Sequence, residues 1–253
     1  MTYCVAVKLN SGVLFLSDSR TNAGMDDISI SKKMLIFKKR LDRTIVILSA
    51  GNLAITQSVR TLLNTTQSRK KLWNATSMYQ IAEIIGNSIR EVKKRDGAAL
   101  EEAGIEFTCS FILGGQIVGE DARLFKIYSA GNFIEAERDC NYFQIGEVKY
   151  GKPILDRVLS PDMSLESAAK CALLSMDSTL RSNISVGLPL DLFLYDVNEP
   201  ELIKYKFIDQ NNLYFLRMKE SWSKHLKKGF DEIESFEWDP ENISFNEIIL
   251  RDK

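Results

Sequence analysis

The feature of this chain that most constrains its fold is the order in which strand-like and helix-like hydrophobic periods succeed one another. Predicted strands cover residues 3–9, 12–18, 33–37, 44–48, 105–113, 121–128, 141–145, 188–196 and 201–207, and predicted helices cover 53–63, 76–94 and 164–183. Helices therefore come in runs between runs of strands. Such runs favour an α+β fold with antiparallel layers over a doubly wound parallel sheet. Two stacked sheets between two helical layers are compatible with this order.

Short turn and loop sequences separate these elements. Asn10-Ser11-Gly12 predicts a tight hairpin turn, Gly114-Gly115 and Gly131-Asn132 are expected as further turns, and the polar residues 20–30 predict a loop. Ser164 is placed to cap the helix after it. Beyond residue 207 the chain continues with an amphipathic segment near 219–230 and an acidic run that contains aromatic residues.

Composition excludes several classes of function. Lysine and arginine total 33 against 34 acidic residues, a net charge of -1, which gives no electrostatic case for a nucleic-acid partner. His225 is the only histidine, and the cysteines form no Cys-x-x-Cys pair, so we expect no metal site; the cysteines are Cys4, Cys109, Cys140 and Cys171. No stretch reaches the roughly 18 apolar residues of a membrane span, and a signal-peptide pattern is lacking. We therefore expect a cytoplasmic protein with reduced thiols and no membrane partner.

The beginning of the chain, Met1-Thr2, predicts a specific chemistry. Removal of Met1 would leave a threonine whose hydroxyl and free α-amino group share one residue, so that nucleophile and general base are held together covalently. An α-amino group has a reference pKa of about 7.7 to 8.0, which makes it a usable base near neutral pH where a lysine amine is not. Because threonine is small enough to allow removal of Met1, we expect a mature chain that starts at Thr2.

The Met-Thr dipeptide is common among proteins, and it gains meaning only from the order of the residues after it. In order along the chain come Thr2, Ser17-Asp18-Ser19-Arg20, Gly24, Lys32-Lys33 and Ser49-Ala50-Gly51. This order resembles that of the proteasome-type β subunits, an N-terminal-nucleophile hydrolase family. The stretch from Ser175 to Gly187 resembles one branch in particular, the bacterial Anbu proteins. The resemblance covers residues 2–207 and implies a four-layer αββα sandwich for that catalytic domain, with residues 208–253 as a C-terminal extension packed on or between subunits.

The resemblance also implies roles for individual residues. Thr2 is the nucleophile, Lys33 lies against it and lowers the pKa of its hydroxyl, and Asp18 keeps Lys33 charged and oriented. The backbone N–H of Gly51 is the implied oxyanion donor, a contact worth about 2.7 to 4 kcal/mol in a hydrolase. Arg20 is an implied supporting residue. Without the resemblance, Lys33 would be a surface charge, Asp18 a turn residue or the partner of Arg20, and Gly51 a turn glycine.

Two positions depart from the pattern of the proteasome β subunits. The chain has Glu147 where those subunits have a serine and Ser182 where they have an aspartate, while Ser185 matches their second serine. Ser182 and Ser185 are the implied supporting residues here, and such groups orient catalytic side chains, so the departures bear on rate and competence. Asp177 could supply a replacement carboxylate, although its spacing from Arg181 more simply predicts an i, i+4 ion pair.

A substrate pocket is expected beside Thr2. Ser31 and Leu35 share a face with the catalytic lysine because side chains alternate along a strand, and Ser49 and Leu53 lie two residues before and after the oxyanion glycine. By resemblance these four positions line the pocket for the residue before the cut bond. None is charged, so we expect a preference for small or medium apolar residues. In the alternative interpretation, Leu35 and Leu53 are core residues and the pocket lies elsewhere.

Together these features imply a self-assembling threonine peptidase or amidohydrolase that cleaves peptide bonds without a cofactor. The expected partners are a peptide substrate and further copies of the chain, in a large homo-oligomer that forms a ring or ring-like spiral; whether an ATPase also binds is open. Apolar stripes on helices 76–94 and 164–183 support self-association, unless each stripe packs on a sheet. Two alternatives stay open: a non-catalytic or very weakly active assembly subunit, and a dedicated amidase for one small peptide-like substrate.

Overall fold

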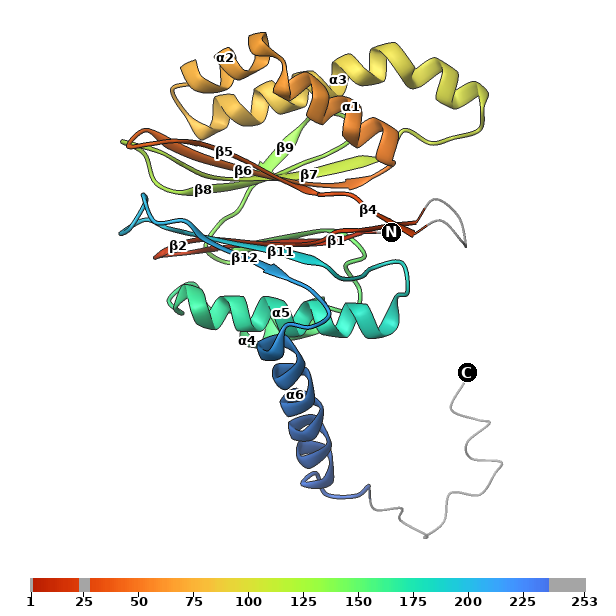
Figure 1. Ribbon diagram of the computed structural model, residues 1–253, viewed down its shortest axis with the longest axis vertical. Coiled ribbons are helices and arrows are strands. Elements are labelled where there is room, and N and C mark those ends of the chain that lie inside the picture. The colour runs from red at the N-terminus through yellow and green to blue at the C-terminus, as the bar shows by residue number, and fades with distance from the viewer. Residues whose placement is uncertain (1, 23–27, 237–253) are drawn as a thin grey trace, which may run out of the picture.

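The computed structural model describes residues 2–22 and 28–236, and it has four layers (Figure 1). One five-stranded sheet has the order β5-β6-β7-β8-β9, and the other has the order β10-β1-β2-β11-β12. Every neighbouring pair of strands in both sheets is antiparallel. Helices α1, α2 and α3 cover the outer face of the first sheet, and α4 and α5 cover that of the second. The predicted αββα sandwich is therefore confirmed.

The strands follow the predicted order, but the strand predicted at 105–113 lies four residues later, at Cys109–Ile117, and the short strand Phe133–Glu135 was not predicted. The first sheet contains β5 (Met34–Lys39), β6 (Arg43–Gly51), β7 (Cys109–Ile117), β8 (Arg123–Ile127) and β9 (Phe133–Glu135). The second contains β1 (Tyr3–Leu9), β2 (Gly12–Asp18), β10 (Tyr142–Gly146), β11 (Leu190–Asp196) and β12 (Lys204–Ile208). A two-stranded ribbon, β3 (Arg20–Asn22) with β4 (Ile28–Ile30), lies within the predicted loop, and Gly24 between these strands lies outside the described residues.

Six helices complete the described part of the chain. They are α1 (Leu53–Asn64), α2 (Thr66–Asn74), α3 (Met78–Glu102), α4 (Lys152–Val158), α5 (Leu165–Ser182) and α6 (Leu213–Asp231). Ser164 caps α5 as predicted, since its hydroxyl oxygen accepts a hydrogen bond from Ser167 N. No described helix combines the length and hydrophobicity that crossing a membrane requires.

Three apolar cores separate the four layers. Facing side chains of the two sheets, among them Phe15, Val46 and Phe193, form the central core. The stripe of α3 is buried against the first sheet, and that of α5 is buried against the second. The apolar stripes of these two helices are thus covered within one chain, and the argument for self-association that rests on them is wrong.

The Gly114-Gly115 pair is not a turn, because both residues lie inside β7. A Cβ atom on Gly114 would lie 2.8 Å from the ring of Phe15 in the facing sheet. Gly115 has a φ of +134°, and a Cβ atom there would lie 2.0 Å from Thr44 O of the neighbouring strand. The two glycines therefore allow close packing at the centre of the sandwich, which a local turn signal does not distinguish from a chain reversal.

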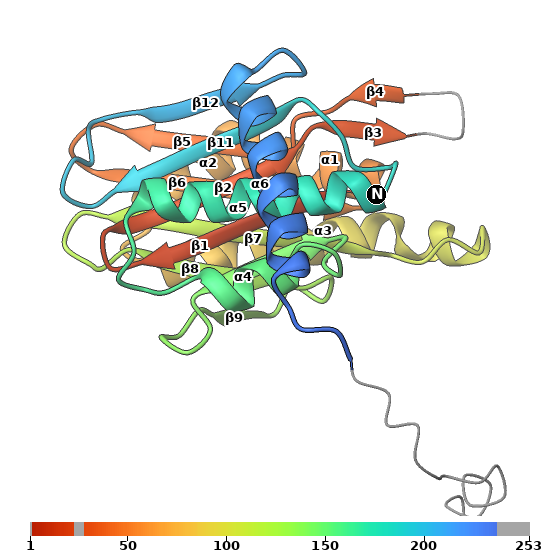
Figure 2. The ribbon, with the colours of Figure 1, turned by 90° about the horizontal axis from the view of Figure 1, so that it is seen from below.

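Helix α6 points away from the layers (Figures 1 and 2). Its first turns are anchored by Phe215, which is buried against α5, and by an ion pair between Lys219 Nζ and Asp177 Oδ1 at 3.5 Å. Farther along, Leu226 and Phe230 are 53% and 77% exposed. The predicted tail helix is therefore present and begins earlier than expected, and residues 237–253 of the expected extension lie outside the described residues.

Candidate active site

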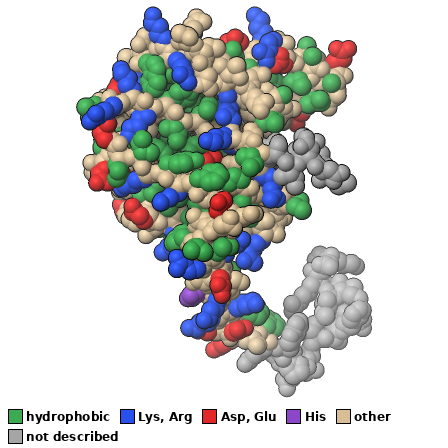
Figure 3. Space-filling model, viewed as in Figure 1, with side chains coloured by type: hydrophobic (Ala, Val, Ile, Leu, Met, Phe, Trp, Pro, Cys, Tyr) green, Lys and Arg blue, Asp and Glu red, His purple; other side chains and the backbone are tan. Residues whose placement is uncertain are grey.

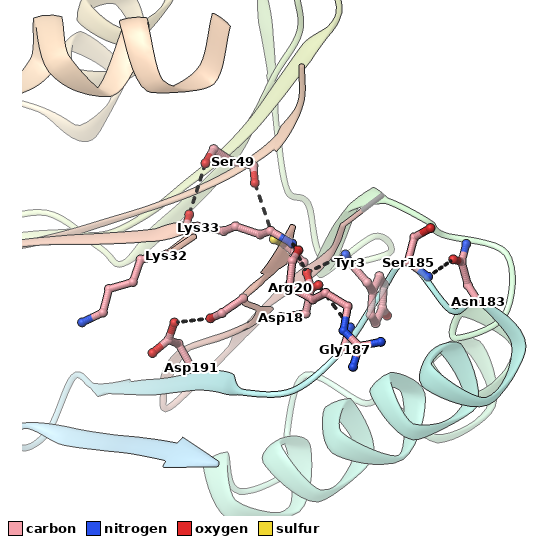
Figure 4. A network of polar contacts seen from close by, with 12 residues as sticks. Tyr3, Asp18, Arg20, Lys32, Lys33, Ser49, Asn183, Ser185, Gly187 and Asp191 are labelled. Atoms are coloured by element: carbon pink, nitrogen blue, oxygen red, sulfur yellow. Dashed lines mark hydrogen bonds and ion pairs between the residues drawn. The ribbon is translucent and has the colours of Figure 1, made fainter. Parts of the chain in front are cut away.

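A buried ion pair lies where β2 of one sheet approaches the start of β5 in the other (Figure 4). Lys33 Nζ lies 2.7 Å from Asp18 Oδ1, and the two side chains are 7% and 0% exposed. The same ammonium donates to Arg20 O at 2.7 Å. A buried charge pair is stable when further hydrogen bonds accompany it, and Lys33 Nζ has the second acceptor Arg20 O. The expected pairing of Asp18 with Lys33 is thus present in the geometry, and Lys33 is not a surface charge.

The Asp18 carboxylate is held by two backbone donors as well. Tyr3 N donates to Asp18 Oδ1 at 3.0 Å, and Gly187 N donates to Oδ2 at 3.4 Å. Complete burial raises the pKa of Asp18, and the charge of Lys33 is the largest influence that opposes this rise. The Asp18 side chain therefore holds both the backbone N–H of Tyr3, the residue after Thr2, and the ammonium group of Lys33.

Thr2 is positioned through its backbone by the end of β10. Thr2 O accepts a hydrogen bond of 2.7 Å from Glu147 N. Gly146 has a φ of +83°, and a Cβ atom on it would lie 1.9 Å from Thr2 O, so only glycine permits this approach. Met1, whose removal is predicted, lies outside the described residues.

Tyr3 adds a side-chain anchor directly after Thr2. Its buried hydroxyl lies 2.6 Å from Ser175 Oγ and accepts from Gln144 Nε2 at 2.7 Å. These contacts tie the start of β1 to α5 and to β10, so the chain enters the site at a fixed position.

The strand that ends in the proposed oxyanion glycine is tied to the lysine segment. Ser49 N and Ser49 Oγ both donate to Lys33 O, at 3.0 and 3.3 Å. Gly51 has a φ of +119°, and a Cβ atom there would meet Thr108 O at 2.5 Å. Asn52 caps α1 directly after it, with its side-chain oxygen accepting from Ala54 N at 3.0 Å. Gly51 thus turns the chain from β6 into α1 at the edge of the site.

A pocket of about 280 Å³ opens beside Thr2. Its lining is formed by Thr2, Arg20, Ser31, Lys32, Lys33, Ser49, Ala50, Gly51, Asn52, Leu53, Thr56 and Arg60. The expected pocket residues Ser31, Ser49 and Leu53 belong to this lining. Leu35 does not: it packs with the core beneath α1, α2 and α3. Strict alternation from Lys33 misplaces it, since β5 begins only at Met34 and Lys33 lies before the regular strand.

Sequence reasoning placed Leu53 in the pocket but missed the other residues that α1 and its cap provide. Asn52, Thr56 and Arg60 succeed one another at spacings of four residues, and all three line the pocket together with Leu53. Side chains four apart on a helix share a face, so this spacing was the available signal once Leu53 had been placed at the helix start.

The supporting residues lie around the loop after α5. Arg20 Nη1 donates to Ile184 O at 3.0 Å, and its guanidinium lies against Gly187. Ser185 N donates to Asn183 Oδ1 at 2.9 Å, near this loop (Figure 4). Ser182 is exposed on the last turn of α5. Neither serine is part of the pocket lining.

Glu147 occupies the position where a serine is expected, and it is only 8% exposed. Its Oε2 accepts from Asn183 Nδ2 at 3.0 Å, and its Oε1 accepts from Lys149 N at 3.3 Å. This links the segment that holds Thr2 to the end of α5.

Asp177 does not supply a carboxylate to the candidate site. It pairs with Arg181 Nε at 3.2 Å, as the i, i+4 spacing predicts, and with Lys219 of α6.

The side chains of this site fit acid–base chemistry with a hydroxyl nucleophile. Within the described ranges, no cluster of three or more histidine, cysteine, aspartate or glutamate side chains is placed to hold a metal ion. Thr2, Lys33 and Gly51 line one pocket. Such a combination is suited to attack on a carbonyl carbon.

Comparison with known proteins shows the family. A family model described as "Proteasome subunit" matches residues 2–188. A curated relative, proteasome subunit beta 2 of Pyrobaculum calidifontis, is 27% identical over 198 residues, which cover 77% of this chain and 88% of the relative.

Solved structures of Anbu proteins are more similar. An Anbu mutant from Hyphomicrobium sp. strain MC1 is 47% identical, with 94% of this chain and 100% of that chain covered and a TM-score of 0.88. Anbu from Yersinia bercovieri, described as an ancestral β subunit, is 48% identical at the same coverage, with a TM-score of 0.86. A helical assembly of the Anbu complex from Pseudomonas aeruginosa is 43% identical, with 93% and 98% covered and a TM-score of 0.87. With the fold, the matched sequence and these neighbours in agreement, the chain belongs to the proteasome-subunit family and, within it, to the Anbu proteins.

Proposed function

We propose that this protein is a threonine-type hydrolase that cleaves peptide or related amide bonds, with Thr2 as the nucleophile. The observation that carries the proposal is the buried pair of Lys33 and Asp18 beside Thr2. An ammonium against the threonine hydroxyl lowers the pKa of that hydroxyl and stabilises its ionised form. The free α-amino group of Thr2, acting directly or through a water, takes the proton, and the N–H of Gly51 stabilises the oxyanion.

Supporting residues hold Thr2, Lys33 and Asp18 in position. Arg20 accepts the second hydrogen bond from Lys33 on its backbone oxygen, while its side chain reaches the loop that contains Ser185. Glu147 and Asn183 take over the orienting role that a serine and an aspartate have in proteasome β subunits. Ser31, Ser49 and Leu53 form part of the substrate pocket.

The three buried thiols, Cys4, Cys109 and Cys171, fit a protein that works in the reducing cytoplasm.

Self-association is part of the proposal, as a large homo-oligomer in a ring or ring-like spiral. The Pseudomonas aeruginosa relative forms a helical assembly. Two uncovered apolar surfaces support association of this chain. One lies on α6; the other is the edge formed by β5 and β12, where hydrophobic side chains gather (Figure 3), including Ile36, Ile203, Tyr205 and Phe207. Exposed apolar patches on this scale mark interaction surfaces.

One alternative has a specific observation in its favour. A pocket of about 280 Å³ is at the small end of the range for ligand sites, and it admits one side chain rather than an extended segment. A dedicated amidase for one small peptide-like substrate is therefore the second candidate. A non-catalytic assembly subunit is disfavoured, because such a subunit has no use for the buried charge pair beside Thr2.

The test combines the mass of the mature N-terminus with a broad hydrolysis screen. An active preparation should begin at Thr2, and Thr2→Ala should abolish turnover while the assembly persists. Asp18→Asn should lower turnover as strongly, and the double variant should be no worse than either single one, because groups that act as a unit are not additive. Full retention of Met1 in an active preparation, or substantial turnover by Thr2→Ala, would move the chemistry elsewhere.

A further inference from the structure

We propose that the pocket beside Thr2 accepts an acidic side chain, and that Arg60 recognises its carboxylate. The proposal rests on the proposed function for the position of the cut bond, and it names the class of substrate. It replaces the apolar preference expected from four uncharged positions, since that expectation did not include Arg60.

The charged residues found in the described pocket lining all have positively charged side chains. Among the described residues that line it, four are basic, Arg20, Lys32, Lys33 and Arg60, and none is acidic. Lys33 is neutralised by Asp18 at 2.7 Å. The remaining three are therefore the candidates for binding an anion.

Two of these three are directed elsewhere. Arg20 reaches Ile184 O with its Nη1 and lies against Gly187, on the side of the loop after α5 (Figure 4). Lys32 points away from the ammonium of Lys33, toward the side of Asp191, with which it lines a separate pocket. Of the cations in the described lining, Arg60 is then the one left for the pocket beside Thr2.

The placement of Arg60 on α1 brings its guanidinium back toward the reacting groups. Arg60 lies seven residues after Leu53, about 10 Å along the helix axis at 1.5 Å per residue. Side chains on a helix lean toward its N-terminus, so the long arginine stem returns along the pocket wall toward Gly51. Its Nη1 donates to Lys32 O, directly before the catalytic lysine. The guanidinium is thus fixed across the pocket from α1 to the start of β5.

Arg60 has binding capacity left. A guanidinium has five N–H donors, and one is used on Lys32 O. Burial lowers the pKa of Arg60, although an arginine stays protonated, and no carboxylate among the described residues contributes to that shift. A half-buried arginine with unused donors binds most strongly to a planar anion such as a carboxylate, which accepts two of its N–H hydrogen bonds at once.

The chemistry then selects among side chains. An aspartate or glutamate before the cut bond would replace lost hydration with charge-assisted hydrogen bonds to Arg60. A lysine or arginine would meet a like charge, and an apolar side chain would cover the guanidinium donors without satisfying them. Ser31 adds a hydroxyl group to the lining of the same pocket. The hydroxyls of Ser49 and Thr56 are already used, since Ser49 Oγ donates to Lys33 O and Thr56 Oγ1 donates to the backbone oxygens of Asn52 and Leu53.

The first experiment measures kcat/KM for the full-length assembly on matched substrates with glutamate, glutamine, leucine or lysine before the same leaving group. Glutamate should exceed glutamine by about 10- to 100-fold, the range of one strong charge-assisted contact. Arg60→Gln should remove that preference, and Arg60→Lys should retain part of it. Arg69→Gln, a matched loss of an exposed arginine on α2, should leave the preference unchanged.

A second readout does not need turnover. The Thr2→Ala assembly should bind N-acetyl-glutamate α-amide at least 10-fold more tightly than N-acetyl-glutamine α-amide, and Arg60→Gln should abolish the difference. N-acetyl-leucine, whose only carboxylate is the α-carboxylate, should bind no better than its amide if the pocket reads a side chain. Stronger binding of the free acid would assign the carboxylate to a substrate C-terminus and overturn the side-chain assignment.

The outcomes separate the two proposals. If no substrate is hydrolysed but the glutamate analogue binds through Arg60, the proposed function fails and the anion site stands. If leucine substrates are cut and glutamate substrates are not, the hydrolase stands and the anion site is wrong. If Arg60→Gln slows all substrates equally, Arg60 only holds the Lys32–Lys33 segment in place, which also overturns the inference.

Discussion

Replacing Lys33 with methionine should destabilise the protein in addition to stopping the chemistry, because it leaves the Asp18 carboxylate buried without a cation. Asp18 is 0% exposed and its partner 7%, with 2.7 Å between the charged atoms. Only the backbone donors of Tyr3 and Gly187 would remain on the carboxylate. Removing one partner of a buried pair costs about 3 to 5 kcal/mol in the free energy of unfolding.

This cost predicts a measurable shift in melting temperature. For a chain of this size, 1 kcal/mol corresponds to about 2 to 4 °C in Tm, so Lys33→Met should melt about 6 to 20 °C below the wild type at neutral pH. Differential scanning calorimetry should be done at one protein concentration, since assembly makes Tm concentration-dependent. The Asp18→Asn, Lys33→Met double variant removes both charges and should recover much of the loss.

The pH dependence supplies the sharper test. Burial raises the pKa of Asp18 and Lys33 is the largest influence against that rise, so the variant should have an even higher Asp18 pKa. An acid with a raised folded-state pKa contributes its full stability below the unfolded value near 3.9 and loses it as pH rises through the folded value. The Tm deficit relative to wild type should therefore shrink as pH falls from neutral toward the unfolded value near 3.9. A deficit that is constant or grows, or a variant that melts with the wild type, would refute this reasoning.

Three further predictions concern activity and assembly. Gly146→Ala should lower kcat about 100-fold, because its Cβ atom would lie 1.9 Å from Thr2 O and would displace the nucleophile by about 1 Å. The control Gly97→Ala on α3 places its Cβ atom no closer than 3.6 Å to a side-chain carbon and should keep full activity, so equal rates for the two variants would contradict the positioning role of Gly146. Because catalysis needs ionised Asp18 and burial raises its pKa, kcat/KM should fall with decreasing pH above the ordinary aspartate value near 3.9, and a rate that stays flat down to pH 4 would count against it. Phe230→Asp, which places a charge on the uncovered face of α6, should shift the light-scattering mass toward smaller species, while an unchanged mass would exclude that face from the assembly.

The sequence by itself determined the layers, and it predicted a threonine nucleophile at the N-terminus. Period-two and helical patterns located most strands and helices because each element buries one face, and burial on one face leaves a period in the sequence. The segment Ser17-Asp18-Ser19-Arg20 and the Lys32-Lys33 pair pointed to the residues of the candidate site without any knowledge of contacts. The same local signals failed at Gly114-Gly115, where glycine serves a close approach between sheets and not a turn.

Only the tertiary structure decided how distant segments meet. Asp18 and Lys33 belong to different layers, and their contact depends on how the sheets stack, which no local period records. Arg60 lies on a helix face that looks like ordinary solvated surface in sequence, yet the helix direction set by Gly51 and Asn52 turns that face into the pocket. Leu35 is misplaced for the complementary reason: a register counted from Lys33 does not hold where the strand has not yet begun. Side-chain periods fix which residues share a face, whereas the packing of faces against one another, a long-range property, fixes what each face meets.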